Sequence, residues 1–136
     1  MWQNDPDTVR RLLNADTWAV VGLTGDPSRA AYGVARWLQQ QGKRIVPVNP
    51  RGSDVLGEQG YRSVADIPFP VDVVDVFRRS EFAGEHADEA IRIGAAVWFQ
   101  LGVLDESAAE RVEAAGLEIV MDTCPKIEAP RLGWVA

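Results

Sequence analysis

The chain has 136 residues, a length that indicates one domain rather than two. Hydrophobic residues make up 46% of it and charged residues 25%, close to the globular average, which excludes a disordered or fibrous chain. The 14 Lys and Arg residues against 20 Asp and Glu residues give a net charge of −6, so no nucleic-acid partner is expected unless the basic residues cluster. A single cysteine, Cys124, excludes an internal disulfide framework.

The hydropathy pattern predicts a protein without membrane contact. No apolar run approaches the roughly 18 residues of a membrane span. The polar, acidic start around Gln3, Asn4 and Asp5 does not resemble a signal peptide. We therefore expect a cytoplasmic protein.

The first expected element is a short helix near the N-terminus. Asp5 can cap it, and Pro6 occupies its first position. The same helix would place Val9, Leu12 and Leu13 on one side.

One pattern then occurs three times: an amphipathic stretch, a glycine and a short β-rich run, around Gly42, Gly94 and Gly116. Glycine is the usual residue just past a helix end, and the nearly continuous apolar runs are typical of parallel strands covered on both faces. The expected strands lie near residues 18–22, 44–48, 72–77, 96–99 and 117–121. Alternating strands and helices predict a doubly wound sheet, in which Pro47 should lie near a strand end because proline lacks a ladder donor.

Ligands of such sheets bind outside the carboxyl ends of the strands, so the loop after the first strand is a candidate site. It contains small residues, the hydroxyls of Thr24 and Ser28, and the start of a helix with free N–H groups, a combination that favours anion binding. Its glycines at positions 22, 25 and 33 do not form G-x-G-x-x-G, and a flexible connection is the alternative.

The second strand ends in Asn49, Pro50 and Arg51. A NAD site has Asp or Glu at about this point, so the sequence favours a phosphorylated ribose, as in NADP or coenzyme A. The alternative is an ordinary Asn-Pro turn.

The third strand ends in the pair Arg78 and Arg79, which either bind a diphosphate or form a solvated face. Within that strand, Asp72 and Asp75 are three residues apart and lie on opposite sheet faces, so we expect structural roles for them. The fourth strand ends in a small-residue turn, Gln100-Leu101-Gly102, at the same edge.

Few residues suggest catalysis. The one histidine, His86, lies in a helical stretch and is expected to be exposed. Cys124 follows the fifth strand and is either a reactive thiol at the crevice, with Lys126 nearby to favour the thiolate, or a small buried hydrophobe.

Taken together, these loops resemble those of the small stand-alone coenzyme A-binding proteins and of the CoA-binding domain that begins the succinyl-CoA synthetase α subunit. The similarity spreads over roughly residues 17–132, and its order and spacing are specific although each motif alone is weak. The matching segments are Val20-Val21-Gly22-Leu23-Thr24, Pro27-Ser28-Arg29, Tyr32-Gly33-Val34-Ala35, Pro47-Val48-Asn49-Pro50, residues 72–79, Gln100-Leu101-Gly102 and residues 121–128.

The resemblance implies a single Rossmann-type domain over residues 1–136, an α/β three-layer fold with a five-stranded, mostly parallel sheet that binds CoA or an acyl-CoA. The diphosphate would lie on the first loop, and the adenosine end near Asn49 and Arg51. The expected CoA-binding residues are Gly22, Thr24, Gly25, Pro27, Ser28, Arg29, Tyr32, Gly33, Val48, Asn49, Pro50, Arg51, Phe77, Arg78, Arg79, Gln100, Leu101, Gly102 and Cys124. A mixed disulfide between Cys124 and the CoA thiol is a further expectation.

The ligase has a second domain with a phosphorylated histidine that nothing in this chain matches, so we expect binding without catalysis. Two alternatives stay open: a small NADP-dependent oxidoreductase, with Tyr32, Tyr61 or His86 as proton donor, and a regulatory interaction module with a vestigial crevice. Five tryptophans are many for a chain of this size, and they either lie at a homodimer face or pack in the core. These residues are Trp2, Trp18, Trp37, Trp98 and Trp134.

Overall fold

A computed structural model, which describes residues 3–136, has one five-stranded sheet with the strand order β2-β1-β3-β4-β5. All four strand pairings are parallel, so the expected α/β fold class is confirmed. The strands are β1 (Thr17–Val21), β2 (Arg44–Val48), β3 (Val73–Val76), β4 (Ala96–Phe99) and β5 (Ile119–Val120).

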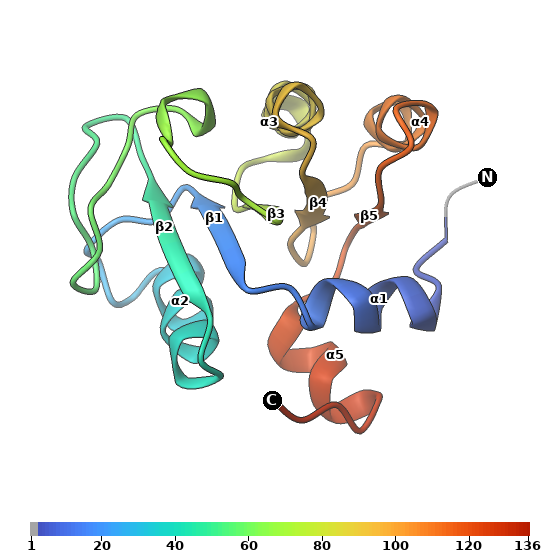
Figure 1. Cartoon of the computed structure of the whole chain (residues 1–136), viewed down its shortest axis with the longest axis horizontal. Coiled ribbons are helices and arrows are strands. Elements are labelled where there is room, and N and C mark those ends of the chain that lie inside the picture. The colour runs from blue at the N-terminus through green and yellow to red at the C-terminus, as the bar shows by residue number, and fades with distance from the viewer. Residues whose placement is uncertain (1–2) are drawn as a thin grey trace.

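Helices cover both faces of this sheet and complete three layers (Figure 1). On one face lie α3 (Ser80–Ile93), α4 (Glu106–Ala114) and the short 3-10 helix η1 (Val64–Asp66). On the other lie α1 (Pro6–Leu13), α2 (Ala30–Gln40) and α5 (Pro125–Arg131). Within residues 3–136, no helix has the length and apolar character to cross a membrane.

Pro47 is the penultimate residue of β2, near the strand end as expected. β2 is an edge strand, and alternate residues of it form hydrogen bonds with the β1 side. One of these residues is Val48, whose carbonyl accepts from the Gly22 N–H at 2.8 Å. Pro47 faces the open edge, where only its carbonyl is needed, accepting from the Tyr61 N–H at 2.9 Å. An edge position tolerates the missing donor.

Four of the five tryptophans lie in the described residues. Trp18 and Trp98 are fully buried under α1, α2 and α5, with ring centroids 5.7 Å apart, and the ring centroids of Trp37 and Trp134 are 6.3 Å apart. Core packing therefore accounts for Trp18 and Trp98, whereas Trp37 and Trp134 are only partly buried and a dimer face stays a prediction for them. Trp2 lies outside the described residues.

The first helix forms as expected. The Asp5 carboxylate accepts from the Thr8 N–H at 3.2 Å, and Val9, Leu12 and Leu13 are buried. This cap satisfies one of the helix's free donors and anchors the start of the domain beside β5.

The topology creates a crevice at one edge of the sheet. β1 and β3 are neighbours, yet the chain passes from β1 to α2 on one face and from β3 to α3 on the opposite face. The loops after these strands therefore diverge, which is the arrangement at which ligands of open α/β sheets bind.

Candidate functional site

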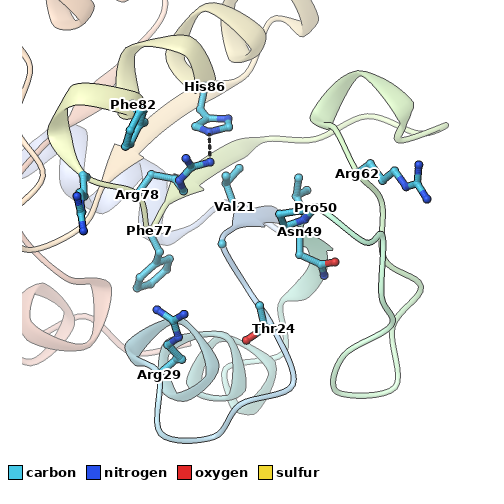
Figure 2. A pocket seen from close by; sticks show the side chains of 13 residues that line it. Val21, Thr24, Arg29, Asn49, Pro50, Arg62, Phe77, Arg78, Phe82 and His86 are labelled. Atoms are coloured by element: carbon cyan, nitrogen blue, oxygen red, sulfur yellow. Dashed lines mark hydrogen bonds between the residues drawn. The ribbon is translucent and has the colours of Figure 1, made fainter.

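A cavity of about 530 Å³ lies at this point, between the loops that follow β1, β2 and β3 (Figure 2). Its volume is in the range of small-molecule sites. The lining residues are Val21, Gly22, Thr24, Arg29, Val48, Asn49, Pro50, Arg62, Phe77, Arg78, Arg79, Phe82 and His86.

The cavity wall is strongly cationic. Four arginines line it, at positions 29, 62, 78 and 79, and among the lining residues there is no Asp or Glu. A chain of net charge −6 thus gathers positive charge at one crevice. Guanidinium groups on a wall without carboxylates are suited to phosphate groups, which they can bind in a bidentate manner, and of the four only Arg79 has a carboxylate partner among the described residues, Glu81 outside the lining.

In the first loop, Gly22 and Thr24 line the cavity but Ser28 does not. The Ser28 hydroxyl and N–H both donate to the Asp26 carboxylate, at 2.7 and 2.9 Å. These bonds, the side-chain one foremost, lower the pKa of Asp26. The expected contact of Ser28 with a diphosphate is therefore not supported by its geometry.

The start of α2 presents unsatisfied N–H groups near the same place. Arg29 occupies the N-cap position, and its side chain makes no capping hydrogen bond. First-turn N–H groups without a cap are a ready site for an anion. The expected anion-binding role of this segment thus has a structural basis in Arg29 and the helix start.

A second cavity of about 210 Å³ adjoins the first and shares Gly22, Arg29 and Phe77 with it. It is otherwise lined by Ala30, Ala31, Gln100, Leu101 and Val103. The Gln100 side chain is buried, and its Oε1 atom has no hydrogen-bond partner. A buried acceptor without a partner is costly, and Gln100, which carries it, is one of the residues that line this cavity.

At the end of β2, the Asn49 amide is fully engaged within the protein. Its Nδ2 donates to the carbonyls of Leu23 and Ser53, both at 3.0 Å, and its Oδ1 accepts from the Ser53 N–H at 2.8 Å. Asn49 thereby ties the first loop to the second.

Arg51 is exposed and does not line either cavity, so its expected place beside the adenosine stays a prediction without geometric support. Arg62, which is also exposed, lines the first cavity, and Figure 2 shows its guanidinium pointing away from Arg29 and Arg78. The loop that follows β2 returns along the sheet edge, where Tyr61 pairs with Val48 in a parallel bridge and brings the next residue to the crevice. No local pattern marks Arg62 in the sequence.

At the end of β3, the expected residues Phe77, Arg78 and Arg79 all line the first cavity. The Arg78 guanidinium lies 5.1 Å from the ring centroid of Phe82 and 3.5 Å from the Nε2 atom of His86. Arg79 pairs with Glu81 at 3.6 Å with its side chain largely exposed. Arg78 therefore contacts two residues of the cavity wall, whereas Arg79 contacts only an exposed carboxylate.

His86 was expected to be exposed and instead lines the cavity, with its side chain only 14% exposed. Its Nδ1 lies 2.6 Å from Oε1 of Glu89. The stripe of buried alanines at positions 83, 87 and 90 in α3 could have located it, because His86 is three residues after the first and four before the last.

The remaining expected residues do not line either cavity. Cys124 is buried in the cluster on the α1, α2 and α5 face, so the expected mixed disulfide has no geometric support. Tyr32 packs partly buried against the same cluster, and Gly102 donates its N–H to Asp122. Those outside both cavities are Gly25, Pro27, Ser28, Tyr32, Gly33, Arg51, Gly102 and Cys124.

The two aspartates of the third strand differ sharply. Asp72 is exposed and accepts from the Thr17 N–H at 3.0 Å, a structural role as expected. Asp75 is fully buried, neither of its carboxylate oxygens has a partner, and desolvation raises its pKa well above the ordinary value. Asp75 does not line either cavity.

Comparison with known proteins places this crevice in a wider context. A family model described as "CoA binding domain" matches residues 16–130. An uncharacterized protein of Bacillus subtilis (strain 168), YneT, is 38% identical over 110 residues, which cover 80% of this chain and 82% of YneT.

Two further relatives come from Pyrococcus. A solved structure of a hypothetical protein from Pyrococcus horikoshii OT3 superposes with a TM-score of 0.88 at 34% identity, covering 97% of this chain and 99% of that one. The α subunit of the acetate–CoA ligase (ADP-forming) II of Pyrococcus furiosus is 37% identical over 65 residues, which are 47% of this chain and 14% of that subunit.

Proposed function

Because this chain belongs to the family of CoA binding domains, we propose that its crevice binds coenzyme A or an acyl-CoA at the carboxyl ends of β1, β2 and β3. One observation carries the proposal: the cavity at the divergence of the β1 and β3 loops is lined by four arginines and by no carboxylate. CoA carries a diphosphate and a ribose phosphate, and such groups need that kind of wall. The similarity to an acetate–CoA ligase subunit supports the same ligand.

The parts of CoA are assigned by the chemistry of each wall. The diphosphate lies over Gly22 and the uncapped start of α2, next to Arg29, where N–H groups and a guanidinium converge. The phosphorylated ribose lies toward Arg62, at the β2 edge. The pantetheine arm enters the second cavity, where an amide N–H donates to the unpartnered Oε1 of Gln100.

We further propose that the domain holds this ligand without chemistry of its own. Neither cavity is lined by Cys, Lys, Asp or Glu. The one histidine on the wall has its Nδ1 held by Glu89 and its Nε2 beside Arg78, an arrangement suited to binding an anion.

A ligand panel tests the proposal. Titration calorimetry of the native protein with CoA, NADPH and NAD should show saturable binding of CoA, weaker binding of NADPH and the weakest binding of NAD. Tighter binding of NADPH than of CoA would favour a nucleotide oxidoreductase instead, and no binding of any of the three would favour an interaction module.

A matched pair of arginine variants tests the assignment of the ribose phosphate. A charge-assisted contact is worth roughly 1.5–3 kcal/mol, so CoA should bind at least about tenfold tighter than dephospho-CoA. Arg62→Ala should remove most of that difference, because Arg62 lines the cavity. Arg51→Ala, an exposed arginine on the same loop and outside both cavities, is the control and should leave the ratio unchanged. The reverse result would return the role to Arg51.

A further inference from the structure

His86 belongs to a chain of polar contacts that runs from the cavity into the fold. Its Nδ1 lies 2.6 Å from Oε1 of Glu89, and Oε2 of Glu89 accepts from the Ser63 hydroxyl at 2.9 Å. The His86 and Glu89 side chains are 14% and 21% exposed. Ser63 is the N-cap of η1, so this series of hydrogen bonds connects α3 to the segment that follows Arg62.

These polar contacts determine which ring nitrogen of His86 carries the proton in the neutral state. An ionised carboxylate only accepts hydrogen bonds, so Nδ1 must be the donor to Glu89. The other nitrogen, Nε2, is then a bare acceptor, and its neighbour on the cavity wall is Nη1 of Arg78 at 3.5 Å (Figure 2). In this state the ring offers the cavity no hydrogen-bond donor.

Charged groups lie on both sides of the ring. Glu89, on the same helix, lies beside Nδ1, and Arg78, from the loop after β3, lies beside Nε2. Arg62 and Arg79 line the same cavity, and Ser63 is uncharged. A phosphate placed between these cations favours a proton at Nε2, because it adds negative charge on that side of the ring.

We propose that His86 is a phosphate ligand of the crevice that acts in its protonated form, so that CoA binding is coupled to the uptake of up to one proton at Nε2. The inference rests on the proposed binding of CoA and deepens it. Nε2–H then donates to a phosphate oxygen, Nδ1–H continues to donate to Glu89, and the Arg78 guanidinium binds the same phosphate from the side. Affinity consequently rises as the pH falls through the range in which histidines titrate.

Calorimetry in two buffers of different ionisation enthalpy counts the protons taken up. At about pH 7, the native protein should take up more protons per CoA than His86→Gln, whose amide can donate to a phosphate without titrating. The comparison is needed because the ribose phosphate itself titrates near pH 6, and its arginine contacts would release a proton. Repeating the titration with dephospho-CoA shows whether the phosphate is that of the ribose or the diphosphate.

The affinities give a second readout. Between about pH 8 and about pH 6, the native protein should gain about fivefold to tenfold in CoA affinity relative to His86→Gln, the difference between a charge-assisted and a neutral hydrogen bond. Glu89→Gln should also reduce the proton uptake, and it carries the comparison if His86→Gln does not fold. Glu85→Gln removes the same charge from an exposed position of α3 and should behave like the native protein.

The outcomes separate this inference from the proposed function. Equal proton uptake and equal pH dependence in the native protein and His86→Gln, with CoA still bound, would overturn the role of His86 and leave CoA binding intact. Failure of the native protein to bind CoA would overturn both.

Discussion

Gly22→Ala is expected to destabilise the fold by about 2–5 kcal/mol. Gly22 has a φ of +93°, a conformation that costs an L-residue roughly 1–2 kcal/mol. A Cβ atom on it would lie 2.7 Å from the carbonyl oxygen of Phe77, which is backbone and cannot turn aside. The resulting overpacking costs roughly another 1–3 kcal/mol.

Urea denaturation of a matched pair measures this effect. Gly25 lies in the same loop, its φ is not positive, and a Cβ there would meet nothing within 4 Å. Gly25→Ala should therefore change the free energy of unfolding by less than about 1 kcal/mol. Equal destabilisation by the two variants would show that Gly22 does not hold β1 close to the end of β3.

Asp75 is expected to make the protein less stable as the pH rises. Burial without a partner raises the pKa of Asp75 well above its ordinary value, so we expect the carboxyl in the folded chain to keep its proton at pH values where a free Asp ionises. In the unfolded chain it ionises above about pH 4. The folded state thus binds one more proton in this range, and the free energy of unfolding must fall as the pH increases.

The size of the effect follows from proton linkage. A difference of one bound proton changes the free energy of unfolding by about 1.4 kcal/mol per pH unit. Between pH 5 and pH 7, Asp75 should therefore lower the free energy of unfolding by up to about 3 kcal/mol, as long as the folded carboxyl keeps its proton. Asp75→Asn has nearly the same shape and no charge to lose. It should remove this fall and be more stable than the native protein at pH 7.

Thermal or urea unfolding at several pH values tests this expectation. Asp66→Asn is the control, because Asp66 is exposed and its substitution should leave the pH profile unchanged. If Asp75→Asn has the same pH profile as the native protein, the carboxyl is not protonated in the folded chain.

Much of the fold could be predicted from the sequence because its signals are local. The apolar runs of β2 and β4 and the glycines after the helices marked the alternating units, and the strand bounds at 44–48 and 96–99 match those found. β5 is shorter than expected, Ile119–Val120 against 117–121, because only these two residues pair with β4.

The binding crevice was predictable where its residues directly follow strands. Gly22 and Thr24 after β1, Phe77 and Arg78 after β3, and Gln100 after β4 all line the cavities. The carboxyl ends of parallel strands meet at one edge of the sheet regardless of loop conformation. A residue that directly follows a strand can therefore be placed at the crevice from the sequence alone.

The residues that were misplaced or missed depend on long-range packing. Arg51 adjoins β2, but the turn there is fixed by the Asn49 side chain and leaves the arginine exposed. Arg62 and His86 reach the crevice through a loop that pairs with the β2 edge and through the second turn of α3. The placement of Arg62 follows from tertiary contacts that no local pattern encodes, whereas the alanine stripe of α3 was a local signal for His86.

Amide chemical-shift mapping during a titration with CoA locates the ligand on the fold. If CoA occupies the crevice between α2 and α3 as proposed, we expect shifts for Gly22, Thr24, Phe77 and Gln100, and none of similar size for Glu128, in α5 and outside both cavities. Shifts confined to the α5 side of the sheet, or the absence of any shift at saturating CoA, would contradict this proposal.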